Sequence, residues 1–461
     1  MAADRHTTVN TVVKAPTPLS SIDLTDDAQV AEVLDLAVRA GEAVLASGTG
    51  VLDTTTTVRL IATTYGLSSC SIDVTYDAIR IWADRGPELP PASAMRVVHD
   101  RSLNFTSLAA VNRLSRRLRT GMIPLDEARA ALDVTTSTPH PYRDWIATVA
   151  RSLMATAIAA LLGAGMIVAA VSFATTVVID RLNRILDGHG LPIFFQHVLG
   201  GAIATVPAIV LANLATRLQI EVNPTLIIAA GITVLLSGLQ LVGAVQDAIT
   251  GAPVTAMARM LEVLMMTGGI IAGIALTLRI AYLIDVTVPP ISFTSGRDIT
   301  DLPLKIAAGA VAAMAFALAC HAERRALVAA ACSGAAGTVC FLLVKQVGFG
   351  PVISSGVAAT LVGLAGGLTA RRALTPPLVI AVAGITPLLP GLRLYRGLYS
   401  VIHDELLAGA DQLLAAGGIG CALAAGVTLG EWFARAARRP HTMQSGAPRR
   451  PITNRRSKPA D

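Results

Sequence analysis

Four charged side chains lie within or beside long apolar stretches of this sequence, where an ionisable group usually has a function. Arg259 and Glu262 are three residues apart, so a helix would place both on one face. There they form either a lasting ion pair or a site in which Glu262 responds to protons. Asp247 precedes them, and a helix-capping role competes with proton coupling at this position. Arg393 stands in a second apolar stretch, where it could bind a carboxylate or extend toward the membrane surface.

Arg393 belongs to a segment that occurs twice. Ala230–Leu241 reads AGITVLLSGLQL and Ala383–Leu394 reads AGITPLLPGLRL, with nine of twelve positions identical at an offset of 153 residues. A shared apolar composition does not produce a fixed register, so the repetition indicates an internal duplication.

Each copy carries helix-breaking residues about ten positions into an apolar run, which is roughly 15 Å into a bilayer core about 30 Å thick. Pro387 and Pro390 lack an N–H, and Gly391 relaxes the backbone, so a helix should break there. Paired interruptions in two halves indicate a transporter binding site. The substrate-binding residues predicted from both copies are Thr233, Ser237, Gly238, Gln240, Thr386, Pro387, Pro390, Gly391 and Arg393. The two threonine hydroxyls could bind a polar substrate or only their own backbone carbonyls.

The composition favours a membrane protein. Of 461 residues, 53% are hydrophobic and only 15% are charged, against about a quarter in soluble domains. The deficit lies in residues 146–436, whereas residues 1–145 have an ordinary polar composition. The sequence therefore predicts an α-helical polytopic membrane protein with a small soluble α+β N-terminal domain.

The expected domains are a disordered N-terminus at 1–25, the soluble domain at 26–135, a linker at 136–145, membrane units at 146–286 and 302–436, and a disordered basic tail at 437–461. In the soluble domain, periodicity predicts a helix from Asp26 to Gly48 and a second helix capped by Asp53 or Thr54. Strands are expected at Cys70–Tyr76, Ala78–Ala83 and Met95–His99, and further helices at Asn104–Arg119 and Pro124–Asp133.

Ten membrane segments are predicted, at 146–163, 166–186, 193–214, 222–245, 256–284, 302–320, 325–345, 351–370, 375–398 and 406–434. The repeated element is fourth in each set of five. An odd number of spans per set turns the second copy upside down, which predicts an inverted-topology repeat. Arginines near both ends of the membrane part favour N- and C-termini in the cytoplasm, although the charges of the loops do not discriminate.

Several partners and cofactors are not expected. Five cysteines without a CxxC spacing indicate neither a disulfide framework nor a zinc site. The basic tail has no aromatic residue to stack on bases, which argues against nucleic acid, and no Walker motif occurs. The predicted partners are a small-molecule substrate and the lipid bilayer, and the sequence leaves open whether copies assemble into a homo-oligomer.

The layout resembles the threonine/serine exporter family. The likeness rests on EAVLASGTGVLDTTTTVRLIATTYGL (Glu42–Leu67), SIDVTYDAI (Ser71–Ile79), VQDAITGAPVTAMARMLE (Val245–Glu262) and TPLLPG (Thr386–Gly391), and it covers about residues 28–434. The resemblance implies a cytoplasmic N-terminal domain, ten spans, and export of L-threonine and L-serine driven by the proton gradient across the bacterial plasma membrane.

Two alternatives stay open. The same fold could export another small polar metabolite, such as a dicarboxylate or a small peptide. The N-terminal domain could instead be a membrane-anchored hydrolase, because Ser71, Asp73, His99 and Asp100 supply the residue types of a hydrolytic site. The sequence has no Gly-x-Ser-x-Gly elbow around Ser71, which favours strand and turn roles for these residues.

Overall fold

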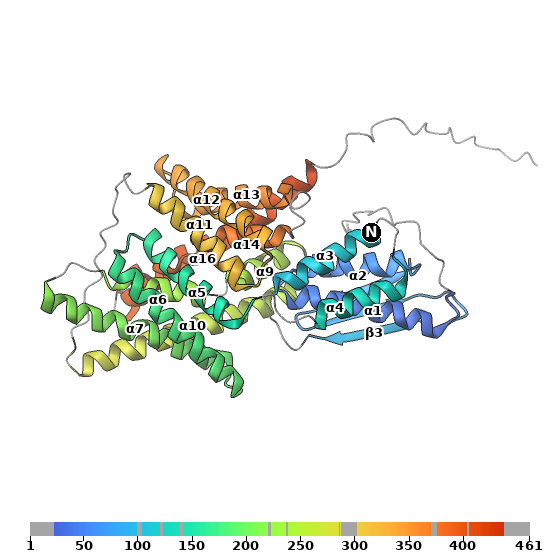
Figure 1. Cartoon of the computed structure of the whole chain (residues 1–461), viewed down its shortest axis with the longest axis horizontal. Coiled ribbons are helices and arrows are strands. Elements are labelled where there is room, and N and C mark those ends of the chain that lie inside the picture. Colours follow the sequence, from blue (N-terminus) through green and yellow to red (C-terminus); the bar gives the residue numbers. More distant parts are fainter. Residues whose placement is uncertain are drawn as a thin grey trace, which may run out of the picture.

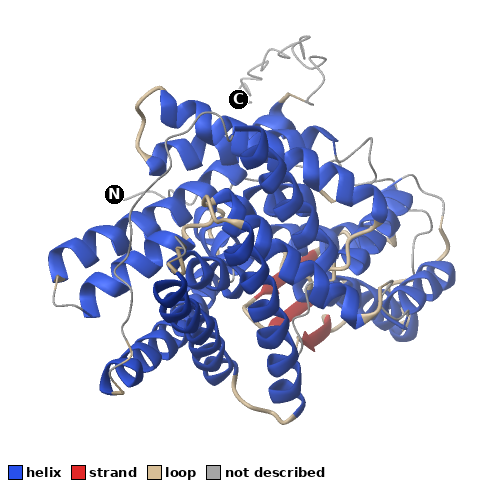
Figure 2. Cartoon of the chain, turned by 60° about the vertical axis from the view of Figure 1, so that its left-hand side comes forward, coloured by secondary structure: helices blue, strands red, loops and turns tan. Residues whose placement is uncertain are grey.

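A computed structural model describes residues 23–98, 104–119, 123–137, 142–219, 223–236, 238–284, 286, 302–369, 376–402 and 405–437. Its helices and strands form two parts, an N-terminal unit (the described residues of 23–137) and a larger body of apolar helices. Figure 1 shows the N-terminal unit at one end of this helical body, and Figure 2 shows how small its sheet is beside the helices.

The N-terminal unit contains four helices and one antiparallel sheet in the order β1-β2-β3. Its elements are α1 (Asp27–Ala46), α2 (Val51–Thr64), β1 (Cys70–Val74), β2 (Ala78–Ala83), β3 (Ala92–Val97), α3 (Phe105–Arg119) and α4 (Leu125–Ser137). The α1 helix begins where expected because the Asp26 carboxylate accepts hydrogen bonds from two first-turn N–H groups. The prediction for α2 was wrong: Gly50 is its N-cap, and Asp53 lies inside the first turn. The third strand also begins earlier than predicted, at Ala92, while His99 and Asp100 lie outside the described residues.

Eight helices of the body are long and apolar enough to cross a bilayer. They are α5 (Asp144–Leu161), α6 (Met166–Gly188), α7 (Ile193–Leu218), α10 (Pro253–Leu283), α11 (Leu302–Ala319), α12 (Arg324–Gln346), α13 (Pro351–Thr369) and α16 (Leu406–Ala436). Two bent pairs raise the number of candidate spans among the described residues to ten. The first pair is α8 (Thr225–Leu235) with α9 (Gly238–Ile249), and the second is α14 (Pro377–Ile385), extended by the 3-10 turn η2 (Thr386–Leu388), with α15 (Gly391–Ile402).

Helix bounds in the two halves of the body correspond closely. The α11 and α12 helices each begin 158 residues after α5 and α6, and both pairs have equal lengths of 18 and 23 residues. The α15 and α16 helices begin 153 residues after α9 and α10, again with equal lengths of 12 and 31 residues. Packing corresponds as well, because α10 lies along α7 as α16 lies along α13. The periodicity in the sequence thus extends from one segment to the order, length and neighbours of whole helices.

The N-terminal unit and the helical body share one hydrophobic core. Phe105 of α3 meets Phe316 of α11 edge to face, with ring centroids 6.3 Å apart. The Phe105 N–H donates to the Cys320 carbonyl at 3.0 Å, and Arg113 forms an ion pair with Glu323 at 2.6 Å. Buried residues of α1 and α3 join those of α11, α12 and α14 in the same cluster. The unit is therefore docked on the body along a packed interface.

Candidate functional site

The two bent pairs have nearly the same backbone geometry at the break. Leu236 follows α8 with φ −63° and ψ 127°, and Leu389 follows η2 with φ −61° and ψ 138°. These residues are equivalent in the duplication, and the pairs bend by 52° and 43°. The first copy breaks without the two prolines of the second, because Val234 and Ser237 stand in their places. Proline therefore reinforces the break but does not create it.

The two breaks meet inside the helical body. Gly391, at the start of α15, lies so close to α8 that a Cβ atom there would fall 1.9 Å from the Thr233 Oγ1 and 3.0 Å from the Ala229 carbonyl oxygen. A small cavity of about 30 Å³ lies between the breaks, lined from both copies by Thr233 with Leu236 and by Thr386 with Leu389. The predicted convergence of the repeated segments is present in the described residues.

The hydroxyls of both threonines bond to their own helices. Thr233 donates to the Ala229 carbonyl at 2.8 Å, and Thr386 donates to the Val382 carbonyl at 2.9 Å. A cavity of this size holds about one or two water molecules, and an amino acid does not fit. The structure is therefore in a closed state at the breaks, which leaves no room there for a molecule of the size of an amino acid.

The other predicted binding residues lie around this cavity with different degrees of burial. Pro387 is buried in η2, whereas Pro390 is half-buried in the extended link to α15. Gly238 begins α9, and Ser237 lies outside the described residues. Arg393 is half-buried on the first turn of α15, next to Arg396, and it forms no ion pair with another residue in the part of the chain that the structure describes.

Arg259 pairs with a different carboxylate from the one expected. Its guanidinium lies 3.2 Å from the Asp247 carboxylate, and the two side chains are 4% and 0% exposed. It also donates to the Thr49 carbonyl at 2.9 Å. Asp247, at the end of α9, faces Arg259 across the α9–α10 turn, a pairing that the sequence did not indicate. Asp247, not Glu262, is the more deeply buried carboxylate.

Asp247 also caps a helix, although not its own. Its second carboxylate oxygen accepts a hydrogen bond of 2.8 Å from the Val51 N–H, at the start of α2. A carboxylate is favoured there because free N–H groups and the helix dipole both attract negative charge. A Cβ atom at Gly50 would lie 3.0 Å from this oxygen, so glycine lets the carboxylate approach. The capping role considered for Asp247 therefore connects the helical body to the N-terminal unit.

Glu262 connects the N-terminal unit to the first broken helix. One carboxylate oxygen accepts a hydrogen bond of 2.7 Å from the Tyr76 hydroxyl, between β1 and β2. The other accepts one of 2.9 Å from the Gln240 side-chain amide, one turn after the break. Glu262 is half-buried at this interface. A carboxylate that accepts from two sides loses one of these bonds when it is protonated.

Asp53 places another carboxylate at the same interface. Asp53 lies near Asp247 and near Arg435 at the end of α16. The negative charge of Asp53 also acts on Glu431 of the same helix end. Burial raises the pKa of Asp53; the negative charge of Asp247 adds to this rise, and Arg435 opposes it. With Glu262, the interface therefore concentrates four carboxylates, Asp53, Asp247, Glu262 and Glu431, against two arginines, Arg259 and Arg435.

We expect Asp53 to make docking of the N-terminal unit dependent on pH. The pKa of Asp53 is raised in the docked state, so protonation of Asp53 favours docking. This contribution to the free energy of unfolding is complete below the ordinary pKa of an aspartate and disappears as the pH rises through the raised pKa. Asp53→Asn should stabilise the protein at neutral pH and flatten the dependence on pH. Thermal unfolding from pH 5 to 8 would measure this, and an equal pH slope in the variant would contradict it.

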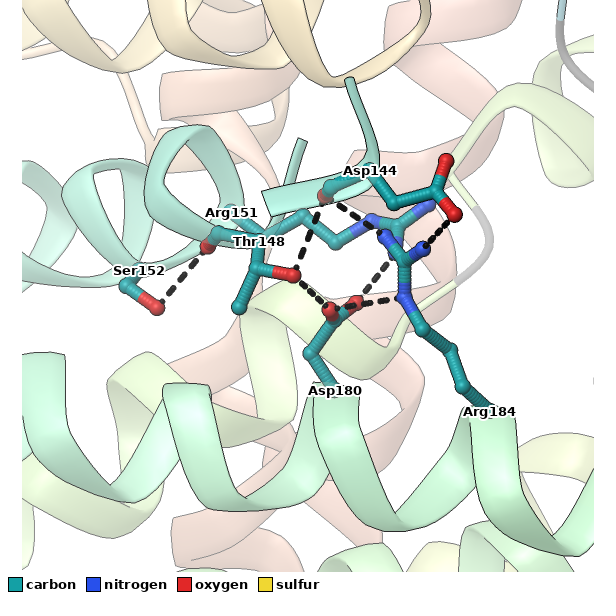
Figure 3. A network of polar contacts seen from close by, with 6 residues as sticks. All are labelled: Asp144, Thr148, Arg151, Ser152, Asp180 and Arg184. Carbon is teal, nitrogen blue, oxygen red and sulfur yellow. Dashed lines mark hydrogen bonds and ion pairs between the residues drawn. The ribbon is translucent and has the colours of Figure 1, made fainter. Parts of the chain in front are cut away.

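A further buried carboxylate lies in the helical body and was not predicted. Figure 3 shows Asp180 of α6 facing α5, where its carboxylate accepts from Thr148 at 2.6 Å and from Arg184 at 3.1 Å and pairs with Arg151. Arg184 also reaches Asp144 at 3.4 Å. Asp180 and Arg184 are one helical turn apart, and this spacing is a signal for an ion pair that could have been read from the sequence.

Removal of the Asp180 charge should destabilise the α5–α6 pair. Asp180→Asn leaves an acceptor for Thr148 but leaves both arginines without their buried counter-charge, so a loss of about 1–3 kcal/mol is expected. The thermal midpoint should fall, whereas Asp187→Asn, an exposed change in the same helix, should stay within about 0.5 kcal/mol. Equal midpoints for the two variants would show that the network adds no stability.

The described part of the suggested hydrolytic site is a plain strand. Ser71 and Asp73 lie on the exposed face of β1, and Asp73 pairs with Arg80 of β2 at 3.6 Å. Ser71 stands opposite Trp82 in the sheet register. Both residues therefore have ordinary places on the exposed face of a strand, and neither position requires Ser71 to be a nucleophile.

Apolar helices sufficient for eight to ten spans, and two broken helices that meet at a cavity, define a polytopic membrane protein of the secondary-transporter class. Residues 35–281 match a family model described as a threonine/serine exporter, and residues 305–433 match a second one described as "Threonine/Serine exporter, ThrE". The "Threonine/serine exporter" of Corynebacterium glutamicum is 42% identical over 92% of this chain and 87% of its own. The "Probable threonine/serine exporter" of Mycobacterium tuberculosis is 36% identical over 89% of this chain and 78% of its own. No solved structure matches the chain.

The chain belongs to the threonine/serine exporter family, a family of bacterial multi-pass transporters.

Proposed function

We propose that the protein exports L-threonine and L-serine from the cytoplasm as a secondary transporter. Its relatives carry this activity in their names, at 42% and 36% identity over most of the chain. The observation in the structure that supports it best is the meeting of the two breaks, because unsatisfied backbone groups at membrane depth are tolerated only beside protein or a cavity.

The substrate chemistry fits the groups at the breaks. An amino acid offers an ammonium group for carbonyls that the broken helices leave free, and a carboxylate for Arg393. In the closed state, the hydroxyls of Thr233 and Thr386 each donate to a carbonyl of their own helix. The hydroxyl of the substrate could replace one of these internal hydrogen bonds. Replacement of one hydrogen bond by another costs little net free energy, so both hydroxyls can turn to a substrate once the broken helices have separated.

We infer that the two sets of five helices are inverted repeats. The N-terminal unit contacts the ends of α9 and α11, the starts of α10, α12 and α14, and the end of α16. In a ten-span topology with the N-terminus inside, all of these ends lie on the inner side. If each bent pair instead returned to the side of the membrane from which it started, the helix ends that the N-terminal unit contacts would lie on both sides of the membrane.

Cysteines at two equivalent helix ends should therefore react from opposite sides of the membrane. Gln219→Cys, after α7, should be labelled from outside, and Thr369→Cys, at the end of α13, from inside, because both positions are exposed. A membrane-impermeant maleimide, applied to cells and to inverted vesicles of a variant whose own cysteines are replaced, would measure this. Labelling of both from one side would contradict the inverted repeat.

The domain division follows from this topology. We propose a cytoplasmic domain at 26–135, a linker at 136–145, and membrane units at 146–286 and 302–436, with both termini in the cytoplasm. The two family matches support the division, because one ends at residue 281 and the other begins at residue 305.

Proton coupling is proposed at Glu262. It joins Tyr76 of the N-terminal unit to Gln240, one turn after the first break, so its protonation would release one contact or the other. Asp247 and Arg259 form the neighbouring buried pair and are the next candidates for coupling.

Counterflow of labelled threonine in vesicles that contain the purified protein would test the function. Vesicles loaded with unlabelled threonine should accumulate the label transiently, and an imposed pH gradient should drive net accumulation. Serine should compete, whereas a dicarboxylate or a small peptide should not. Competition only by the dicarboxylate or peptide would assign another substrate to the same fold, and hydrolysis by residues 26–135 alone would favour the enzyme.

A further inference from the structure

The N-terminal unit covers one end of the region where the two breaks meet. Its turn Ser47–Val51 lies between α9 and α10, with Thr49 bonded to Arg259 and Val51 bonded to Asp247. Tyr76 and Phe105 extend the contact to α10 and to the end of α11. The unit therefore contacts helix ends on one side of the broken helices, and a movement of the unit would change access to them from that side.

The contact at Asp247 is chemically a carboxylate-binding site. A buried guanidinium and the first N–H of a 14-residue helix hold the two oxygens of one carboxylate, at 3.2 Å and 2.8 Å. An amino-acid carboxylate is recognised by the same pair of donors. Beside it, Thr49 is 4% exposed and its hydroxyl has no hydrogen-bond partner among the described residues, so a polar group that the closed state does not supply would satisfy it.

The duplication shows that these groups are not needed merely to build the α9–α10 turn. At the equivalent positions of the second copy, Ser400 replaces Asp247, Gln412 replaces Arg259 and Ala415 replaces Glu262. The α15 and α16 helices nevertheless have the same lengths as α9 and α10. These three charged groups therefore belong to the first copy, whose α9–α10 turn contacts the N-terminal unit.

We infer that Arg259 and the turn Thr49–Val51 form a binding site for the α-carboxylate of the substrate, which Asp247 occupies in the closed state. When the substrate carboxylate displaces the Asp247 carboxylate from this site, the N-terminal unit moves away from the end of the bundle. The inference rests on the proposed function for the identity of the substrate. Once Asp247 is displaced, the substrate carboxylate takes its place on Arg259, and the ammonium group faces the carboxylates of Asp53 and Glu431. The substrate hydroxyl reaches Thr49.

A native cysteine reports on the movement. Cys320 is 5% exposed and lies beneath Phe105, whose N–H bonds to its carbonyl. In a full-length protein whose other four cysteines are alanine, a maleimide should label Cys320 slowly. Addition of L-threonine should accelerate labelling, whereas L-threoninamide, which lacks the carboxylate, should have no effect.

Two variants test the role of Asp247. Asp247→Asn weakens the charged hydrogen bonds, so labelling without ligand should be about tenfold faster or more. Because this change removes the counter-charge of Arg259, the double variant Asp247→Asn/Arg259→Gln removes both charges; it should also label rapidly but should lose the response to threonine. Asp73→Asn, in an exposed ion pair on the sheet, is the matched control and should behave as the parent does.

Three results would overturn the inference: slow labelling of Cys320 in both Asp247 variants, equal acceleration by threonine and threoninamide, or threonine counterflow with no effect of threonine on labelling. A different failure concerns only the proposed substrate. If threonine is not transported but another carboxylate both is transported and accelerates labelling, the carboxylate site stands and the proposed substrate is wrong.

Discussion

Replacement of Gly391 by alanine is expected to abolish transport. The new methyl group would lie 1.9 Å from the Thr233 hydroxyl and 3.0 Å from the Ala229 carbonyl, so α15 would have to move away from α8. Overpacking of this kind costs about 1–3 kcal/mol, and here the displacement falls on the contact between the two breaks. Counterflow of threonine should fall to background while the protein still inserts, and the thermal midpoint should decrease.

Two further variants separate this effect from a general loss of helix quality. Gly417→Ala, in α16, adds a methyl group where no atom lies within 4 Å, so transport should be retained. Thr233→Ala removes the hydroxyl that causes the worst overlap, so the double variant with Gly391→Ala should recover part of the activity. Normal transport by Gly391→Ala would mean that the breaks do not need this close contact.

Replacement of Glu262 by glutamine is expected to uncouple transport from the proton gradient. The amide keeps the size of the side chain and can still bond to Gln240 and Tyr76, but it cannot exchange a proton near neutral pH. Accumulation driven by a pH gradient should disappear, while exchange of threonine across the membrane continues at a reduced rate. Both quantities can be measured in the same vesicles.

Tyr76→Phe is the matched control for Glu262. It removes the 2.7 Å hydrogen bond but leaves the carboxylate in place, so coupling should persist. If Glu262→Gln still concentrates threonine to the level of the parent, the proton is carried elsewhere, and Asp247 is the next residue to test. Loss of coupling in the Tyr76→Phe variant would indicate that coupling depends on the Tyr76–Glu262 hydrogen bond more than on protonation of Glu262.

Much of the helical body was predictable because apolar periodicity and duplication are local properties of a sequence. The positions of α6, α12 and α16 follow from hydrophobic runs, and the breaks follow from Pro390 and Gly391 in one copy and from register in the other. The start of α2 was not predictable in this way. Its N-terminus is satisfied by Asp247, which is 196 residues away in sequence, so no nearby Ser, Thr, Asp or Asn was needed at the N-cap.

The site was predictable only where both partners come from the repeated segment. Thr233 and Thr386 were found because they are equivalent by duplication, and they line one cavity. The Asp247–Arg259 pair was not predicted, because helical spacing to Glu262 is visible in the sequence, whereas the fold of α9 against α10 is not. Asp53 and Tyr76 were not predicted, since their importance depends on how the N-terminal unit docks on the body.

The shared core also sets an order of events during synthesis. Thr106 and its partner His321 are 215 residues apart in the chain, and the remaining contacts of α3 reach as far as α14. At about 5–20 residues per second, the ribosome needs roughly 10–40 s to make the intervening chain. For that time α11, α12 and α14 are not yet there to cover Phe105 and its neighbours, so we expect the nascent chain to depend on chaperones or on rapid insertion. Truncation within the second half should therefore cause aggregation or degradation of the first.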